Sequence, residues 1–131
     1  MNNYVWVRKK ILIAEDEEVN FLFIEAILEE TKATLIWAHN GQDAVNKVNE
    51  NNDIDIILMD IKMPKLNGYE ATHQLRAAGY SGPIVALTAC AMLEDIKRCE
   101  EVGCNAHLAK PVVREKITEL IFRLVKSKGN S

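Results

Sequence analysis

The sequence predicts an α/β fold in which a parallel sheet of five strands is covered by helices on both faces. Short apolar runs alternate along the chain with segments whose apolar residues recur at helical spacing. Such alternation is typical of parallel strands joined by crossover helices. The run at 56–59 is apolar throughout and stops at Asp60, which indicates a strand buried on both faces. A chain of 131 residues suits one domain with a proper core.

In the first half of the chain, the two patterns alternate in short segments. Residues 11–14 and 34–38 are apolar or β-branched and are bounded by polar residues, as expected of strands. Residues 18–30 and 44–50 place apolar side chains three and four positions apart, as expected of helices. The strand at 56–60 completes this half.

The second half continues the alternation. Residues 84–87 and 106–109 are short and apolar, and they predict the fourth and fifth strands. Helical spacing predicts helices over 69–78, 92–102 and 114–126.

The predicted helix at 18–30 carries apolar residues on two neighbouring arcs. The first arc holds Phe23, Ile24, Ile27 and Leu28, and the second holds Val19, Leu22 and Ala26. A helix that lies on a sheet cannot easily bury both arcs. The second arc is therefore either part of a wide core face or an exposed patch that docks a partner.

Chemically reactive side chains follow four of the predicted strands. Right-handed crossovers place the carboxyl ends of parallel strands at one edge of the sheet, where ligands bind. This topology brings together Glu15, Asp16, Asp60, Thr88 and Lys110. Crowded carboxylates need a counter-charge, and their oxygens suit Mg²⁺. A metal, an ammonium and a hydroxyl around a nucleophilic Asp60 would make a clamp for a transferring phosphoryl group.

Composition bears on nucleic-acid binding, membrane insertion and cellular compartment. The net charge of −3 gives no general reason to bind nucleic acid. No apolar stretch approaches the length of about 20 residues that a membrane span needs, and no signal peptide is apparent. Cys90, Cys99 and Cys104 form no Cys-x-x-Cys pair and are expected to be reduced thiols in a cytoplasmic protein.

Four motifs then match a known family. They are Ile-Leu-Ile-Ala-Glu-Asp-Glu, Leu-Met-Asp-Ile-Lys-Met-Pro-x-x-x-Gly-Tyr-Glu-Ala-Thr, Ile-Val-Ala-Leu-Thr-Ala and Leu-Ala-Lys-Pro. In this order and spacing they resemble the receiver domain of two-component response regulators, and most of all receivers of hybrid sensor histidine kinases. The resemblance covers residues 10–126. It implies a flavodoxin-like (βα)5 three-layer sandwich with strand order 2-1-3-4-5.

The resemblance also implies a phosphorelay function. Asp60 would accept a phosphoryl group from a histidine kinase or a histidine phosphotransfer protein. Asp16 and Asp60 would ligate Mg²⁺ together with the backbone carbonyl of Lys62, and Glu15, which replaces the commoner Asp, would act largely through water.

The resemblance also implies that the conformational switch begins beside Asp60. Thr88 and Lys110 would bind phosphoryl oxygens, and in the family Thr88 then moves inward and an aromatic residue follows. His107 occupies that aromatic position here, which departs from the usual Tyr or Phe. Cys90 stands, with Lys62, where family side chains tune the phosphoryl lifetime. The Lys110–Pro111 bond is usually cis in the family.

The remaining expectations concern partners and boundaries. Val19 and Leu22 would dock a phosphotransfer helix beside the site, and a phosphorylation-dependent homodimer is compatible with the family. Residues 1–9 are expected to be an extension or linker remnant, and 127–131 a flexible tail. The alternative from another class is an enzyme, a Mg²⁺-dependent phosphatase or phosphotransferase with an Asp nucleophile. The signalling module is preferred, because short loops leave no room for a substrate cap.

Overall fold

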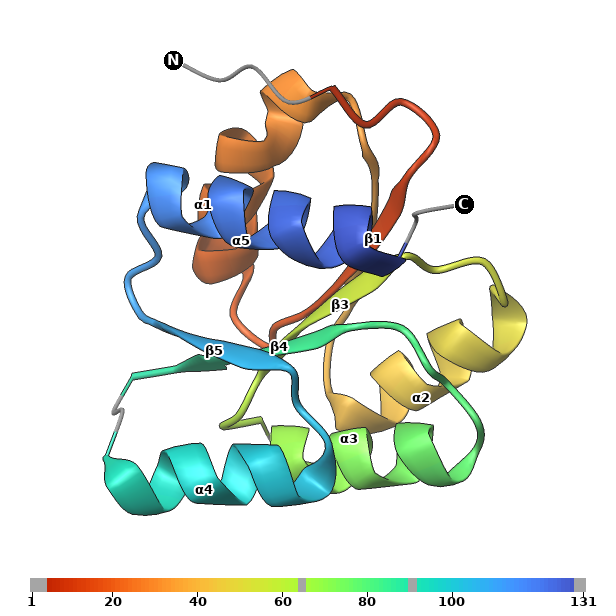
Figure 1. The fold of residues 1–131 in the computed structure, drawn as a ribbon, viewed down its shortest axis with the longest axis vertical. Coiled ribbons are helices and arrows are strands. Elements are labelled where there is room, and N and C mark those ends of the chain that lie inside the picture. The colour runs from red at the N-terminus through yellow and green to blue at the C-terminus, as the bar shows by residue number, and fades with distance from the viewer. Residues whose placement is uncertain (1–4, 64–65, 90–91, 129–131) are drawn as a thin grey trace.

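The structure is a computed structural model that describes residues 5–63, 66–89 and 92–128, with side chains as far as residue 125. Strands and helices alternate along this part of the chain (Figure 1). In order they are β1 (Lys10–Ala14), α1 (Glu18–Leu28), the 3₁₀ turn η1 (Glu29–Thr31), β2 (Thr34–Ala38), α2 (Gly41–Glu50), β3 (Ile56–Asp60), α3 (Gly68–Ala77), β4 (Ile84–Thr88), α4 (Leu93–Val102), β5 (Ala106–Ala109) and α5 (Arg114–Lys128). Helix α5 extends two residues beyond its predicted end, and the predicted tail at 129–131 lies outside the described residues.

The sheet has five strands in the order β2-β1-β3-β4-β5, and every neighbouring pair is parallel. The predicted fold class and strand order are therefore confirmed. The register aligns Asp60 with Leu87 and Thr88 with Ala109, so the polar ends of the central strands lie at the same level. Strand β3 is buried along its whole length, as its unbroken apolar run predicted.

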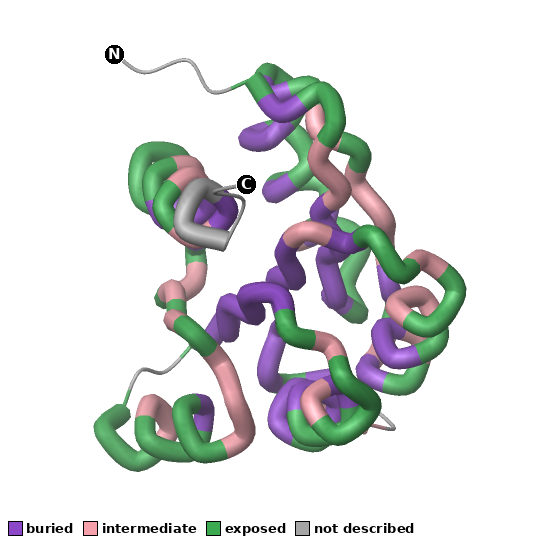
Figure 2. The backbone as a smooth tube through the Cα atoms, turned by 45° about the vertical axis from the view of Figure 1, so that its right-hand side comes forward, coloured by how far each residue is buried: buried purple, intermediate pink, exposed green. Residues whose placement is uncertain are grey.

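Helices cover both faces of this sheet. Figure 1 shows α1 and α5 on one face and α2, α3 and α4 on the other. Successive side chains of a strand point to opposite faces, and Ile13 and Leu58 accordingly pack in one core while Leu12 and Ile57 pack in the other. Figure 2 shows the burial concentrated in the central strands between these layers.

Helix α1 buries most of the first predicted arc, because Ile24, Ile27 and Leu28 all lie in the core. Phe23 of that arc is 48% exposed, and Phe21 lies in the core instead. The ring of Phe21 stacks on Trp37 of β2 with centroids 4.4 Å apart. Val19 and Leu22 are 76% and 47% exposed, so they belong to an exposed apolar patch rather than to a wide core face.

The amino end of α3 is fixed next to the end of β3. Asn67 and Glu70 form a capping box, in which the Asn67 side chain accepts a hydrogen bond from the Glu70 amide at 3.0 Å. At the other end Ala78, the last residue of the predicted helix, is exposed and forms the C-cap.

The described part of the N-terminal extension packs on the domain. Trp6 is buried in the core shared with α1 and α5, and its amide donates a hydrogen bond to the Thr31 carbonyl. Residues 5–9 therefore contact the folded unit. Among the described helices, none combines the length and apolar character that crossing a membrane requires.

Candidate functional site

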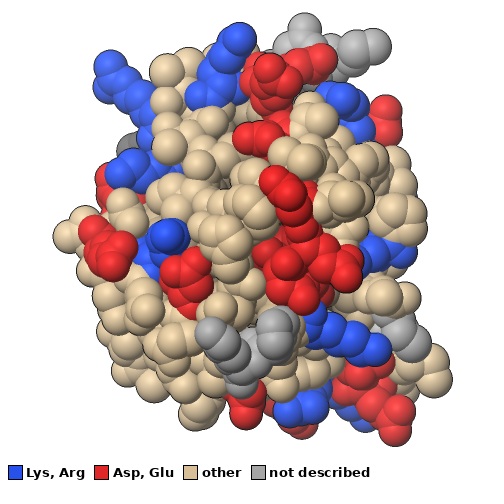
Figure 3. Space-filling view, turned by 180° about the vertical axis from the view of Figure 1, so that it is seen from behind, with Lys and Arg blue, Asp and Glu red and all other residues tan. Residues whose placement is uncertain are grey.

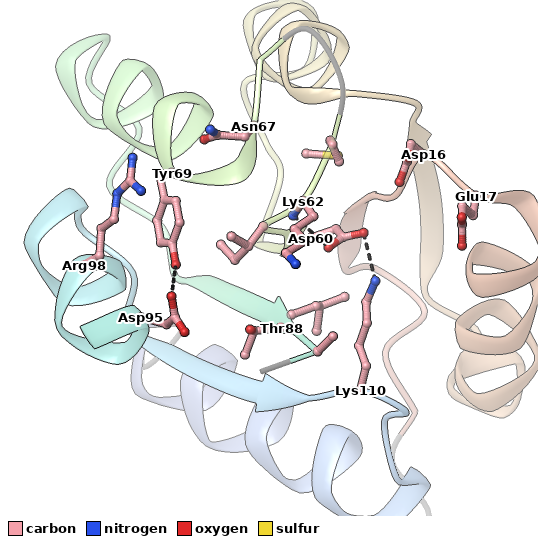
Figure 4. A pocket seen from close by; sticks show the side chains of 14 residues that line it. Asp16, Glu17, Asp60, Lys62, Asn67, Tyr69, Thr88, Asp95, Arg98 and Lys110 are labelled. Atoms are coloured by element: carbon pink, nitrogen blue, oxygen red, sulfur yellow. Dashed lines mark hydrogen bonds and ion pairs between the residues drawn. The ribbon is translucent and has the colours of Figure 1, made fainter. Parts of the chain in front are cut away.

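An open cleft of about 740 Å³ lies at the carboxyl edge of the sheet. Its walls come from the loop after β1, the end of β3, the loop before α3 and the start of α3, the end of β4, the residue after β5, and the first turns of α4. Figure 4 shows the side chains that line it, with Asp60 and Lys110 pointing toward each other. Asp16, Asp60, Thr88 and Lys110, which were predicted to converge, all line this cleft.

Asp60 and Lys110 form the central ion pair. Lys110 Nζ donates to Asp60 Oδ2 at 2.8 Å, and the other carboxylate oxygen, Oδ1, accepts a hydrogen bond from the Lys62 amide at 3.2 Å. Asp60 is only 4% exposed. Burial by itself would lower the pKa of Lys110, but the hydrogen bond and charge of Asp60 outweigh it, so the pKa of Lys110 is raised. The lysine is therefore held as a cation against the Asp60 carboxylate.

Glu15 lies behind this pair and is completely buried. Its Oε2 accepts hydrogen bonds from the Glu17 amide and the Asn20 side chain, each at 3.3 Å. Its Oε1 makes no hydrogen bond and lies 3.3 Å from Lys110 Nζ. Burial, and next the charge of Asp60, raises the pKa of Glu15 to about 7. One lysine thus neutralises two carboxylates incompletely.

The residues present fit a divalent cation. Carboxylate oxygens of Glu15, Asp16 and Asp60 all lie within 4.8 Å of one another, and Asp16 is exposed at the mouth of the cleft. A buried oxygen without a hydrogen bond and a raised carboxyl pKa both indicate a site short of positive charge. An all-oxygen ligand set with room for water is the set that Mg²⁺ prefers.

The loop that carries Glu15 is anchored from β2, which the sequence did not reveal. The indole nitrogen of Trp37 donates a hydrogen bond of 2.8 Å to the Glu15 carbonyl. The Trp37 ring lies between Phe21 and His39, with centroids at 4.4 Å and 4.1 Å. The hydrogen bond and the ring stack together hold the loop that follows β1 against strand β2.

Gly68 allows α3 to begin against the end of strand β3. A Cβ atom at this position would lie 2.4 Å from the Asp60 carbonyl oxygen, so no larger residue fits without a backbone shift. The Gly68 amide donates to the Ile61 carbonyl at 2.9 Å. The end of β3 and the start of α3 are therefore packed closely together at this corner.

Thr88 and His107 have different positions relative to the cleft. Thr88 is buried and lines it, and its carbonyl accepts a hydrogen bond from the Lys110 amide at 2.9 Å. His107 is exposed and does not line it; the histidine borders a separate hollow of about 520 Å³ between α4 and α5. The Lys110–Pro111 bond is cis, as expected. Cys90, placed by sequence among the residues that tune phosphoryl lifetime, lies outside the described residues.

The cleft also contains a cluster that the sequence did not single out. Tyr69 of α3 and Asp95 and Arg98 of α4 line it, and none of them ends a strand or belongs to an obvious acid–base motif. The available signal was the position of Tyr69 directly after the glycine at the start of α3.

Surface charge adds no sign of a nucleic-acid site on the face seen from behind. Figure 3 shows acidic side chains gathered near the centre of that face, with Lys and Arg side chains scattered around it. A continuous basic surface would be needed to track a phosphate backbone.

Comparison with known proteins places the chain in a family. The family described as "Response regulator receiver domain" matches residues 11–122. The osmosensing histidine protein kinase SLN1 of Saccharomyces cerevisiae is 40% identical over 118 residues, which cover 86% of this chain and 10% of that protein. The sensor histidine kinase RcsC of Escherichia coli is 33% identical over 111 residues, 85% of this chain and 12% of that protein. The chain thus spans about a tenth of the length of these relatives.

Solved structures of receiver domains are also similar to this chain. The receiver domain of sensor histidine kinase PA1611 from Pseudomonas aeruginosa, solved with a magnesium ion in its active-site cleft, is 38% identical with a TM-score of 0.81 and covers 89% of this chain and 97% of its own. The receiver domain of Ssk1 from Saccharomyces cerevisiae, solved with the histidine phosphotransfer protein Ypd1, is 30% identical with a TM-score of 0.85 and covers 92% and 90%. With this sequence, strand order and acidic cleft, the chain belongs to the response regulator receiver domains of two-component signal transduction.

Proposed function

We propose that Asp60 of this receiver domain accepts a phosphoryl group from a phosphohistidine. The observation that carries the proposal is the 2.8 Å contact between Lys110 Nζ and Asp60 Oδ2 inside a cluster of three carboxylates. A carboxylate oxygen of Asp60 attacks phosphorus, an acyl phosphate bond forms, and the bond from phosphorus to the donor imidazole nitrogen breaks. Lys110 neutralises charge on the phosphoryl oxygens during this exchange.

Glu15, Asp16 and Asp60 are the residues that would hold Mg²⁺, with Glu15 acting largely through water and the Lys62 carbonyl as a further ligand. The cation would supply the positive charge that Lys110 alone does not provide to these carboxylates. The magnesium-bound receiver of PA1611 supports this assignment by similarity.

Thr88 would report the modification. Its position beside Lys110 at the end of β4 lets its hydroxyl reach a phosphoryl oxygen after a small inward shift. His107 replaces the usual aromatic residue of the family and is exposed on β5. A polar imidazole gains less than a Tyr or Phe ring from filling the space vacated by Thr88, so we expect His107 to contribute little to the switch.

The donor is a histidine kinase or a histidine phosphotransfer protein, and the docking surface is the exposed apolar patch of α1. Val19 and Leu22 lie on this patch, and Phe23, which is 48% exposed, extends it. The helix begins just after Asp16, so a partner seated on it reaches the cleft. The Ssk1 receiver bound to Ypd1 supports a phosphotransfer partner by similarity.

The domain would act in the cytoplasm as a non-enzymatic module, in a phosphorylation-dependent homodimer or as part of a hybrid kinase like those it resembles. Self-catalysed phosphorylation and dephosphorylation at Asp60 are the reactions expected of it.

The test is phosphorylation by acetyl phosphate with Mg²⁺, followed by intact mass measurement. The wild type should gain one phosphoryl group only when Mg²⁺ is present, and Asp60→Asn should gain none. Asp16→Asn should gain it slowly even at high Mg²⁺. Continuous release of phosphate from an external phosphomonoester at enzyme-like rates would overturn the module in favour of a phosphatase.

A further inference from the structure

Tyr69 joins α3 to α4 at the rim of the cleft. Its hydroxyl lies 3.5 Å from Asp95 Oδ1, a long and therefore weak hydrogen bond, and the Arg98 guanidinium lies over its ring at 4.1 Å from the centroid. Figure 4 shows the ring reaching from α3 to both α4 side chains. Tyr69 is 6% exposed, whereas Arg98 is exposed. A buried aromatic side chain thus anchors two charged residues of the neighbouring helix.

The same residues separate two hollows of the surface. Tyr69 and Arg98 line the cleft, and they also line a groove of about 370 Å³ between α3 and α4 that includes His73 and Val102. Moving the Arg98 side chain off the ring would open the cleft into this groove. The contact is therefore placed to change the shape of the surface, and not only its stability.

Tyr69 and its two partners on α4 are connected to different parts of the site. Tyr69 follows Gly68, which is packed against the backbone of Asp60, so the ring is fixed to the corner that carries the acceptor. Asp95 and Arg98 belong to the first turns of α4, which follows Thr88 and the end of β4. A shift of Thr88 relative to Asp60 would therefore move one side of the contact relative to the other.

Charge gives the direction of the effect. Phosphorylation adds negative charge and acceptor oxygens to a cleft that Asp95 and Arg98 both line. The added charge repels the Asp95 carboxylate and attracts the Arg98 guanidinium toward the cleft. Both forces act against the two contacts with Tyr69.

We propose that Tyr69, Asp95 and Arg98 form a latch that holds α4 against α3 in the unphosphorylated protein and opens when Asp60 is phosphorylated. This inference rests on the proposed phosphoryl acceptance at Asp60 and adds a route to α4 that bypasses His107. Opening exposes the groove between α3 and α4 and changes the face that a partner meets.

Hydrogen–deuterium exchange of the α4 amides, with and without acetyl phosphate and Mg²⁺, tests the latch. In the wild type, phosphorylation should speed exchange over 93–102 about three- to tenfold, the size expected for losing one weak hydrogen bond and one cation–π contact. Tyr69→Phe, which keeps the ring, and Arg98→Met should show raised exchange before phosphorylation and a small further rise after it.

His73→Ala is the matched control, because His73 lines the same groove and, among the described residues, has no hydrogen bond, ion pair or ring contact with Tyr69, Asp95 or Arg98. This variant should behave as the wild type. His107→Ala should also keep the phosphorylation response of α4. Wild-type exchange in both latch variants, before and after phosphorylation, would overturn the latch. Intact mass separates the two proposals: no phosphoryl gain in the wild type refutes the function at Asp60, while the unphosphorylated variants still report whether Tyr69 holds α4.

Discussion

Lys110 Nζ lies 2.8 Å from Asp60 Oδ2 and 3.3 Å from Glu15 Oε1, so one ammonium group serves two buried carboxylates. Asp60 and Lys110 are separated by 50 positions in the sequence, and the parallel register of the sheet brings them together. The arrangement leaves the carboxylates of the cleft incompletely neutralised. The shortage of positive charge favours binding of a cation and raises the pKa of Glu15.

Replacing Lys110 should slow phosphorylation without abolishing the acceptor. Lys110→Met removes the charge that, in the proposed function, stabilises the phosphoryl oxygens, and the loss of one such group typically costs about 10²–10³ in rate. The initial rate of mass gain with acetyl phosphate at fixed Mg²⁺ measures the effect. Lys116→Met, at an exposed position of α5, is the control and should keep the wild-type rate. An unchanged rate in Lys110→Met would contradict the assigned role.

Glu15 should make the metal-free protein less stable as the pH rises. Its pKa is about 7 in the folded state against an ordinary value of 4.5, so between these values the unfolded chain releases a proton that the folded protein keeps. Release of that proton on unfolding favours the unfolded state progressively as the pH rises through this window, and the penalty is constant above it.

Thermal unfolding of the wild type and Glu15→Gln in EDTA, from pH 4 to 8, measures this difference. The melting temperature of the wild type should fall relative to that of Glu15→Gln over about pH 4.5–7. Added Mg²⁺ at pH 8 should raise the melting temperature of the wild type more than that of the variant. Parallel curves for the two proteins in EDTA would refute the raised pKa.

Gly68 and Gly79 should respond differently to alanine. Gly79 has φ 102° and open space around it, so Gly79→Ala should cost roughly 1–2 kcal/mol of unfolding free energy through backbone strain and leave phosphorylation unchanged. Gly68→Ala forces a methyl group against the Asp60 carbonyl, which should cost about 1–3 kcal/mol and also slow phosphorylation. Denaturant unfolding and the acetyl phosphate assay measure the two effects. Equal phosphorylation rates in both variants would show that the corner at Gly68 does not position Asp60.

The exposed patch of α1 should affect protein donors but not small ones. Val19→Ala and Leu22→Ala each remove apolar contact area, and each should slow transfer from a phosphorylated histidine phosphotransfer protein about fivefold, equivalent to about 1 kcal/mol. Their rates with acetyl phosphate should equal the wild-type rate. Val7→Ala, exposed to 62% in the N-terminal segment, is the control. Slower reaction with acetyl phosphate would instead point to damage at the cleft.

The sequence by itself determined the fold and the centre of the site. The unbroken apolar run before Asp60 predicts a buried strand, and alternation with helical spacing predicts a parallel sheet, whose geometry alone requires Asp16, Asp60, Thr88 and Lys110 to converge. These conclusions depend on the local periodicity of apolar residues and on the rules by which strands and helices connect. Both can be read directly from the order of the residues.

Only the tertiary structure decided how individual faces are used. Periodicity gives the relative positions of side chains around a helix but not the rotation of the helix against the sheet, so Phe21 rather than Phe23 entered the core, where it stacks on Trp37. Likewise the outward position of His107 and the contact of Tyr69 with α4 depend on packing between elements distant in sequence. Such contacts have no local signature, because the free energy that selects them arises only when the layers meet.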